Sequence, residues 1–257
     1  MNQEHSVLCV DIGNTSCRAG IWKNGALESV RSIFTTEFIK YSKEWINDFK
    51  QHSRIAYCSV VPHAEHAFLS RLSEKLRSSI YQLTSVNQSI LPITYPHPEE
   101  IGSDRIANSI AAFKLFKLPS IIIDLGTATT FDVISNGRGY EGGIIIPGPQ
   151  GMLDFLGNHT ALLPKITLGN ECMPDLPVGK STSAAMLSGI KFGYLPMINA
   201  ILDVLQTQFL EQKIKDYAII QTGGKAEDFL IEKAILKPWL TLEGLATACL
   251  GHPLNSS

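Results

Sequence analysis

A short pattern of residues occurs twice in this chain, and the two copies lie about half a chain length apart. Each copy has an apolar run, an Asp, an aliphatic residue, a Gly, small hydroxyl or amide residues, a second apolar run and an Asn-Gly pair. The first copy covers 7–15 and the second covers 121–129, and the Asn-Gly pairs follow at 24–25 and 136–137. Repetition at this period favours a duplicated domain over a solenoid.

The chemistry of the repeated pattern suits phosphate. A buried strand would deliver Asp11 or Asp124 at its carboxyl end, and a Gly turn lets backbone N–H groups approach a ligand closely. Each Asp could hold a hard cation such as Mg²⁺. The alternative for a single copy is an ordinary strand followed by a hairpin turn, because Asp and Gly are common turn residues. Two matching copies favour two loops that clamp the phosphates of a nucleotide.

The order of the expected elements indicates an α/β protein. Residues 6–34 form three strands in a meander, because Asn24-Gly25 is a strong hairpin signal, and residues 119–146 repeat that meander. Strands and helices alternate within each half. We therefore expect two domains, 1–115 and 116–257, that pack around one cleft. Further strands are expected over 54–61, 80–83 and 217–221, and helices over 36–50, 64–78, 104–117, 182–211, 226–236 and 242–250, with another that starts at Pro147-Gly148.

Charge and cysteine content narrow the class of protein. The 257-residue chain has a formal net charge of −2 and no basic block, which argues against nucleic acid as a partner. Its five cysteines are scattered without a Cys-x-x-Cys pair, which fits a reducing compartment and gives no metal-site spacing. Residues 1–5 lack the features of a signal peptide, and no apolar run approaches membrane-spanning length. We expect a cytoplasmic protein with no membrane or nucleic-acid partner.

Two shorter motifs are ambiguous when each is taken alone. Residues 178–182 resemble the end of a phosphate-binding P-loop, but Pro174 stands where that motif needs its first Gly, so we exclude a P-loop. Thr182 then remains a helix cap or a ligand contact. Residues 222–224, Thr-Gly-Gly, are either a strand-to-helix turn or a place where the backbone approaches a planar ligand closely.

The segment 102–105, Gly-Ser-Asp-Arg, opens an expected helix and admits two interpretations. Ser103 suits the N-cap position, and Asp104 in the first turn would interact favourably with the helix dipole. Alternatively, Asp104 is a general base beside the phosphate loops, and Arg105 is a cation that grips an anionic substrate. The local sequence favours capping, whereas the functional interpretation depends on the phosphate loops.

Together these motifs resemble those of the type III pantothenate kinases, within the actin-like (ribonuclease H-like) ATPase superfamily that includes the sugar kinases. The resemblance covers about 8–250. Residues 11–15 and 124–130 are similar to the two phosphate motifs, which specify only the superfamily, and the segment 102–105 between them specifies the family. Ser181 departs from the Asn expected in many relatives. Supporting matches lie at 59–62, 142–148, 160–164 and 222–224.

The resemblance implies duplicated actin-like domains with mixed sheets, and ATP-dependent phosphorylation of pantothenate to 4′-phosphopantothenate, the first step of coenzyme A synthesis. It implies that Asp104 accepts the proton of the attacking hydroxyl and that Arg105 binds the pantothenate carboxylate or a nearby oxygen. It also implies Mg²⁺ at Asp11 and a monovalent cation, K⁺ or NH₄⁺, near Asp124. The implied ATP-binding residues are Asp11, Gly13, Asn14, Thr15, Gly126, Thr127, Gly223 and Gly224. The implied pantothenate-binding residues are Tyr95, Gly102, Ser103, Arg105 and Thr182.

The resemblance also implies a homodimer. Apolar residues of the helix that starts near Thr182 could form an isologous interface, although their burial inside one subunit is nearly as compatible with the sequence. These residues are Ala184, Ala185, Met186, Leu187, Ile190 and Phe192.

Two other functions remain open. One is a kinase or phosphatase of the same superfamily that acts on another small alcohol or phosphate. The other is a regulatory accessory protein of the same fold, since some relatives have been linked to transcription. The net charge of −2 argues against this second alternative, because a DNA-binding face would be basic.

Overall fold

The structure is a computed structural model of the chain. The helix ends expected at residues 50 and 78, and the segment 1–5, lie outside the described residues. The packing of the backbone groups the chain into two compact units, and the boundary expected at 115/116 stays a prediction. The described residues are 6–47, 49, 54–77 and 80–251. The first unit is Met1–Ile122, Asp132–Gly142 and Trp239–Ser257, and the second is Ile123–Phe131 and Gly143–Pro238.

In the part of the chain that the structure describes, the strands form two five-stranded sheets with the same strand order. The first sheet has the order β3-β2-β1-β4-β5, and the second has the order β10-β9-β6-β7-β8, which is the same order read from the other edge. The first strand of each set, β1 or β6, therefore takes the central position. This match confirms the predicted α/β fold with a duplicated sheet. The strands are β1 (Val7–Ile12), β2 (Ser16–Lys23), β3 (Ala26–Phe34), β4 (Arg54–Ser59), β5 (Ile80–Gln82), β6 (Ser120–Leu125), β7 (Ala128–Ser135), β8 (Gly139–Pro147), β9 (Ala218–Thr222) and β10 (Ile235–Leu236).

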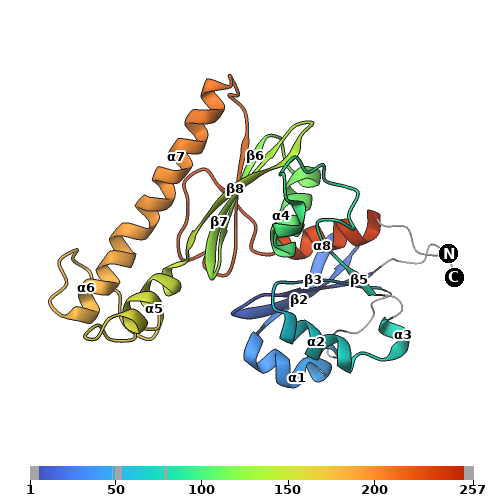
Figure 1. The fold of residues 1–257 in the computed structure, drawn as a ribbon, viewed down its shortest axis with the longest axis horizontal. Coiled ribbons are helices and arrows are strands. Elements are labelled where there is room, and N and C mark those ends of the chain that lie inside the picture. Colours follow the sequence, from blue (N-terminus) through green and yellow to red (C-terminus); the bar gives the residue numbers. More distant parts are fainter. Residues whose placement is uncertain (1–5, 48, 50–53, 78–79, 252–257) are drawn as a thin grey trace. The chain divides into compact units, whose positions relative to one another are not determined.

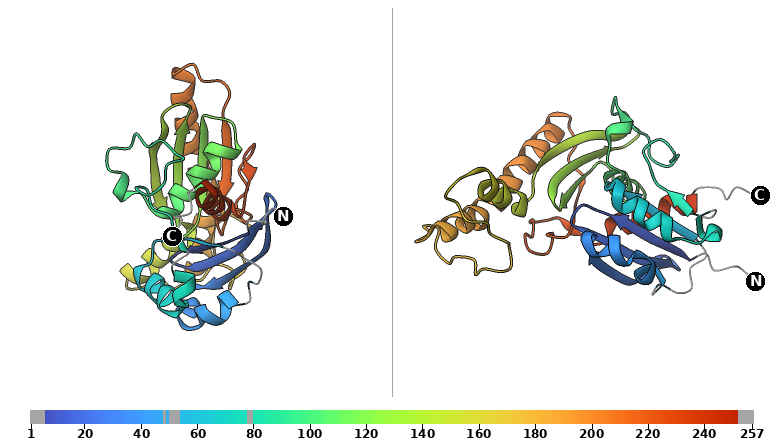
Figure 2. Two further views of the ribbon diagram at one scale, coloured as in Figure 1. Left: turned by 90° about the vertical axis from the view of Figure 1, so that its right-hand side faces the viewer. Right: turned by 60° about the horizontal axis from the view of Figure 1, so that its bottom comes forward.

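The central strand β1 is buried along its whole length, because helices cover both faces of the first sheet. It pairs antiparallel with β2 and parallel with β4, so the sheet is mixed. Leu8, Val10 and Ile12 share one core cluster with Phe38 of α1 and Phe68 of α2. Helices α4 and α8 lie on the opposite face (Figures 1 and 2). The helices of this unit are α1 (Thr35–Asn47), α2 (Pro62–Arg71), α3 (Glu74–Arg77), the 3₁₀ turn η1 (Pro98–Glu100), α4 (Ser103–Leu115) and α8 (Leu240–Gly251).

Helices α4 and α8 pack so closely that one contact leaves no room for a side chain. A Cβ atom on Gly244 of α8 would overlap the carbonyl group of Ala107 in α4. Beside this contact, the hydroxyl of Thr241 donates a hydrogen bond of 2.9 Å to Oδ1 of Asn108. Both side chains are buried, so the bond satisfies polar atoms that water does not reach. The close packing of α4 and α8 thus depends on a glycine at position 244 and on the buried hydrogen bond between Thr241 and Asn108.

The second unit contains a long helical stretch that the sequence predicts correctly. α6 (Thr182–Gly189), the π-helical turn η2 (Ile190–Tyr194) and α7 (Leu195–Glu211) follow one another without a break, after α5 (Pro149–His159). This stretch is long and apolar enough, by length and composition, to cross a membrane, although the sequence analysis expected no such run. Leu202, Leu205 and Phe209 on α7 are buried within the chain, as in the core helix of a folded domain.

The helix expected over 226–236 does not form, and turns followed by β10 stand in its place. The reason is the buried side chain of Gln221. Its Nε2 donates to the carbonyl oxygens of Ala226 and Phe229 at 2.7 and 2.6 Å, and its Oε1 accepts the N–H of Ile231 at 3.0 Å. These bonds take backbone groups that a helix would have to pair with one another.

The helix expected over 64–78 is divided into α2 and α3. Leu72 has an extended backbone with φ −74° and ψ 144°, and its N–H closes the last turn of α2 by bonding the carbonyl oxygen of Leu69. The other expected helices and strands form close to their expected bounds.

Gly244→Ala should destabilise the fold, because the new methyl group has to push α8 away from α4. Overpacking of this kind costs about 1–3 kcal/mol of unfolding free energy. The control is Gly189→Ala, since a Cβ atom there has nothing within 4 Å and Ala stabilises a helix relative to Gly by roughly 0.5–1 kcal/mol. Urea unfolding measures both changes. A Gly244 variant as stable as the native protein would contradict the described packing.

Candidate active site

Asp11 and Cys58 are neighbours at the carboxyl ends of two parallel strands. The register aligns Asp11 of β1 with Cys58 of β4, so their side chains lie on the same face of the sheet. The thiol donates a hydrogen bond to Oδ1 of Asp11, with a sulfur–oxygen distance of 3.5 Å. Burial, together with the negative charges of Asp11 and Asp104, raises the pKa of Cys58. Cys58 therefore stays a protonated thiol that can donate this bond.

The loop after β1 turns back on itself, as expected of a phosphate loop. The N–H of Gly13 donates to the carbonyl oxygen of Ser16 at 3.1 Å. The hydroxyl of Thr35 donates to the carbonyl oxygen of Gly13 at 2.6 Å, and the N–H of Thr35 donates to that of Thr15 at 3.0 Å. The first residue of α1 thus supports the loop, whose tip residues Asn14 and Thr15 are exposed.

The start of α4 is bonded to the end of β4 and has no side-chain cap. The hydroxyl of Ser103 donates to the carbonyl oxygen of Ser59 at 2.9 Å and accepts the N–H of Ser59 at 3.1 Å. Gly102 occupies the N-cap position, without a side-chain hydrogen bond. The capping interpretation of Ser103 is therefore wrong, because its hydroxyl is committed to a neighbouring strand. These two bonds hold the segment 102–105 beside the residue that follows Cys58.

Asp104 is a partly buried carboxylate with a raised pKa. Its Oδ1 accepts the N–H of Arg105 at 2.8 Å, which satisfies one of the unpaired donors at the helix start. Burial raises the pKa of Asp104 above the ordinary value of 3.8, and the hydrogen bond and charge of Arg105 offset this only in part. A carboxylate that merely favoured the helix dipole would be stabilised as an anion, with a lowered pKa. The raised pKa favours the general-base interpretation.

Arg105 is bound by a carboxylate that the sequence analysis did not single out. Asp132 of β7 is fully buried, and its Oδ1 accepts hydrogen bonds from Nε and Nη2 of Arg105 at 3.0 and 2.6 Å. The same oxygen accepts the hydroxyl of Tyr140 at 2.9 Å. The ring of Tyr140 stands edge-on to that of Tyr95, with centroids 6.1 Å apart. Two residues expected to contact substrate, Arg105 and Tyr95, therefore belong to one network.

The loop after β6 turns back as the first loop does. The N–H of Gly126 donates to the carbonyl oxygen of Ala128 at 3.0 Å. Asp124 is the last residue but one of β6, which is the position that Asp11 has in β1. Thr127, at the tip of this loop, is exposed. The two copies of the sequence pattern therefore form equivalent strand ends and turns.

The Thr-Gly-Gly segment packs directly against this second loop. Gly223 has φ 102°, a conformation that favours Gly, and a Cβ atom there would lie 2.6 Å from the backbone nitrogen of Leu125 and would overlap Oδ1 of Asp124. The N–H of Lys225 donates to the carbonyl oxygen of Leu125 at 2.8 Å. The second unit thus brings Gly223 together with Asp124, and Gly224 beside it is exposed.

Thr182 is the exposed first residue of α6 and does not cap that helix. Ser181 does, since its hydroxyl accepts the N–H of Ala184 at 3.1 Å. The capping interpretation of Thr182 is therefore wrong. Ser181, the residue that departs from the family pattern, is therefore the one that caps the helix.

The apolar residues expected at a dimer interface fall into two groups. Met186, Leu187 and Ile190 are buried within the chain, so they cannot form an interface without rearrangement. Ala184 is partly exposed, and Ala185 and Phe192 are exposed. The interface stays a prediction, and only this second group is open to a partner.

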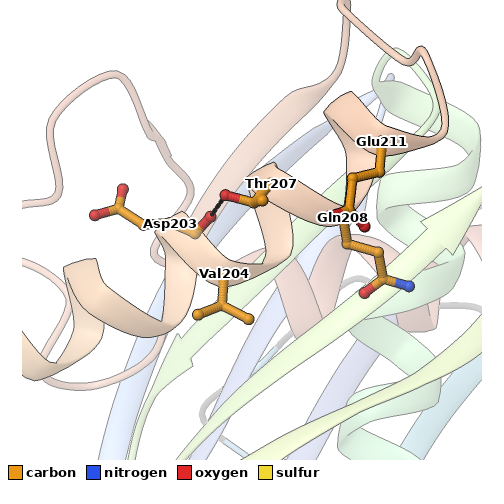
Figure 3. A pocket seen from close by; sticks show the side chains of 5 residues that line it. All are labelled: Asp203, Val204, Thr207, Gln208 and Glu211. Carbon is orange, nitrogen blue, oxygen red and sulfur yellow. Dashed lines mark hydrogen bonds between the residues drawn. The ribbon is translucent and has the colours of Figure 1, made fainter.

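A shallow pocket is lined by residues of α7, a part of the sequence that contains none of the predicted site residues. It is lined by five exposed side chains of this one helix, and the hydroxyl of Thr207 donates to the carbonyl oxygen of Asp203 at 2.8 Å (Figure 3). None of the expected site residues lines it. Because a single helix surface lacks converging groups, this pocket is a poor candidate for the active site. Its lining residues are Asp203, Val204, Thr207, Gln208 and Glu211.

The family model described as Type III pantothenate kinase matches residues 7–204. The chain belongs to the type III pantothenate kinase family. It is 32% identical over 255 residues to the type III pantothenate kinase of Desulfosudis oleivorans, covering 93% of this chain and 96% of that protein. It is 34% identical over 253 residues to that of Shouchella clausii, with the same coverage.

Two solved structures share the fold of this pantothenate kinase family member. One is a conserved protein from Campylobacter jejuni assigned to the Baf family of transcriptional activators, with a TM-score of 0.53 and 22% identity over 94% of this chain and 96% of that chain. The other is the ethanolamine utilization protein EutJ from Carboxydothermus hydrogenoformans, with a TM-score of 0.52 and 14% identity over 96% of this chain and 90% of that chain. Identities this low establish the fold alone.

The structure thus assembles the expected residues in two groups, one in each unit. The first unit holds Asp11, the first loop, the segment 102–105 and Tyr95, and the second holds Asp124, the second loop and Gly223. Sequence reasoning missed Cys58, Asp132 and Tyr140. A usable signal existed for one of them, because Asp132 interrupts the apolar run of a strand expected to be buried, and a buried charge needs a partner.

Asp104→Asn should not lower the melting temperature at pH 7. The folded-state pKa of Asp104 is raised, so its ionisation above the unfolded-state pKa opposes folding, and the neutral amide removes that cost. The advantage of the variant should shrink as the pH falls through the folded-state pKa, where native Asp104 is protonated. Melting curves from pH 4 to 8 test this. A variant less stable by the roughly 0.3–1 kcal/mol expected for a lost dipole interaction would restore the structural interpretation.

Proposed function

We propose that this protein phosphorylates pantothenate with ATP to form 4′-phosphopantothenate, the first step of coenzyme A biosynthesis. Membership of a family named for this activity supports the proposal. The structural observation that carries it is the partly buried Asp104, whose negative charge acts on the thiol of Cys58 together with that of Asp11. Phosphoryl transfer to an alcohol needs a base for the hydroxyl and a carboxylate at the phosphates, and mainly requires that they be positioned.

Asp104 is the proposed general base. It accepts the proton of the primary hydroxyl of pantothenate as that oxygen attacks the γ-phosphoryl group. Its raised pKa makes it a stronger base than an ordinary aspartate and brings it closer to the working pH. Arg105 donates hydrogen bonds to the pantothenate carboxylate or a nearby oxygen. The remaining proposed contacts to pantothenate are Tyr95, Gly102, Ser103 and Thr182.

Asp11 is the proposed Mg²⁺ ligand. The residues fit a kinase-type site, in which one or two carboxylates and the substrate phosphates hold the ion. In the described part of the chain, His, Cys, Asp and Glu side chains form no group of three or more that could hold a metal by themselves. Bound Mg²⁺ would neutralise charge on the phosphates. Gly13, Asn14 and Thr15 cradle those phosphates with backbone and side-chain donors.

Asp124 is the proposed ligand of a monovalent cation, K⁺ or NH₄⁺. Its carboxylate lies beside the tightly packed turn at Gly223, where backbone groups are close, and oxygen donors suit hard cations. Gly126 and Thr127 bind the phosphates from the second loop. Gly223 and Gly224 lie near the adenosine, because backbone without side chains lets a planar base approach.

A homodimer is the proposed assembly. Exposed apolar side chains occur in the segment before α6 as well as on it, with Leu162 92%, Leu176 70% and Val178 66% exposed. Such side chains in one region are typical of surfaces that another protein covers. The expected cytoplasmic location stays a prediction, to which the buried free thiols Cys9, Cys17, Cys58 and Cys249 are suited.

The regulatory alternative has weaker support. The likeness to the Campylobacter protein establishes the fold only, and the acidic motif residues Asp11, Asp104 and Asp124 are all present. A kinase of another small alcohol remains the second candidate, since the phosphate loops serve the whole superfamily.

The purified protein should release ADP when given ATP, Mg²⁺, K⁺ and pantothenate. A coupled assay measures this, with a panel of sugars and glycerol as alternative acceptors. We expect pantothenate to be the preferred acceptor and activity to be lost when EDTA removes Mg²⁺ or when a large organic cation replaces K⁺. ADP release with a sugar but not with pantothenate would assign the second candidate function.

Light scattering should give a particle of twice the 28.2 kDa chain mass. Leu162→Glu should reduce the mass to that of a monomer, because it places a charge among the apolar side chains proposed for the interface. Leu230→Glu is the control, since Leu230 is 62% exposed but lies outside that segment. A native protein that is monomeric at micromolar concentration would rule out the dimer.

A further inference from the structure

We propose that Asp132 is the positioning residue of the acceptor site: it holds the guanidinium of Arg105 in one orientation and leaves the Nη1 edge for an oxygen of the acceptor substrate. This inference rests on the proposed function only for the identity of that substrate. The geometry, described below, lies within one compact unit.

The bonding pattern of Arg105 is one-sided. Its Nε and Nη2 both donate to the same oxygen, Oδ1 of Asp132, at 3.0 and 2.6 Å. One edge of the planar guanidinium is therefore occupied by a carboxylate from a strand that lies 27 residues further along the chain. Neither of these two bonds uses Nη1, on the other side of the guanidinium. A second oxygen acceptor can therefore bind Arg105 without displacing the first.

Asp132 is itself held in place. Its side chain has no exposed surface, and Oδ1 accepts a third hydrogen bond from the hydroxyl of Tyr140 at 2.9 Å. The guanidinium carbon of Arg105 lies 5.8 Å from the centre of the Tyr140 ring, which restricts the side chain from another direction. Since a free Arg side chain has many rotamers, this enclosure removes, before binding, an entropy cost of ordering the side chain that binding would otherwise include.

The carboxylate of Asp132 also keeps the guanidinium of Arg105 charged. Although burial alone would lower it, the carboxylate of Asp132 raises the pKa of Arg105, so the side chain stays charged. Because Asp132 compensates that charge, Arg105 acts as a directed donor and not as an unpaired cation. Arg105 also follows Asp104 directly in the chain, and its charge partly offsets the rise that burial causes in the pKa of that carboxylate.

The test is a double-mutant cycle on Asp132 and Arg105. Asp132→Asn keeps the shape of the side chain but removes its charge, Arg105→Lys keeps the charge but cannot form the two-pronged contact, and the third variant carries both changes. KM is measured for pantothenate and for ATP, with kcat and melting temperature. Binding of pantothenate by calorimetry, in the presence of a non-hydrolysable ATP analogue, adds a readout that does not depend on turnover.

Each single variant should raise the pantothenate KM and dissociation constant about 10- to 100-fold, with the ATP KM changed by less than about 3-fold. The double variant should be no worse than the more affected single variant, because both changes abolish the same contact. The control is Glu141→Gln, which removes a partly exposed ion pair of 3.3 Å with Arg138 and should leave both KM values unchanged.

Three results would overturn the proposal. If the fold-increase in the pantothenate KM of the double variant equals the product of the two single increases, Asp132 acts independently of Arg105. Equal changes in the KM of pantothenate and of ATP, or a lower melting temperature with unchanged KM values, would leave Asp132 a structural role only. If Asp132→Asn does not fold, the Arg105→Lys variant provides the test by itself. A native affinity of that variant for pantothenate would contradict the proposed role of Asp132 in positioning Arg105.

Failure of the proposed function gives a different result, because the native protein then releases no ADP with pantothenate. In that case the same variants are compared by their KM for the acceptor that the native protein does use.

Discussion

The parallel pairing of β1 with β4 is the interaction on which the first unit's chemistry depends. β1 is buried on both faces and ends one residue beyond Asp11, and its register with β4 places Cys58 beside that carboxylate. The next residue of β4, Ser59, then bonds the hydroxyl of Ser103 through both its N–H and its carbonyl oxygen. One strand pair therefore positions the proposed phosphate loop, a thiol donor and the start of the helix that carries Asp104.

The duplicated architecture could be predicted from the sequence because its signals are local and repeated. An apolar run followed by Asp and Gly marks the central strand of each sheet, and the Asn-Gly pairs mark the hairpins beside it. The site loops follow from the same pattern, since Asp11 and Asp124 end equivalent strands. Candidate residues whose proposed role depends on their own neighbours in the chain could therefore be named from the sequence.

Residues whose role depends on distant parts of the chain were not found. Ser103 has the composition of a helix cap, yet its hydroxyl bonds another strand. The buried amide of Gln221 captures the backbone groups that an expected helix needed. Asp132 and Arg105 are 27 residues apart and meet only in the folded chain. In each case a tertiary hydrogen bond outweighs a local preference, and only the coordinates reveal the partner.

Asp104 is the residue at which the two interpretations of the helix start differ most. Its burial, and the pKa that this burial raises, fit a base that works on a hydroxyl and not a carboxylate that serves the helix dipole. The most direct measurement is single-turnover phosphoryl transfer by Asp104→Asn, with substrate binding determined on the same protein. The account predicts pantothenate and ATP binding close to native, with a transfer rate lower by about 10²–10⁴-fold. A native transfer rate in the variant would contradict it.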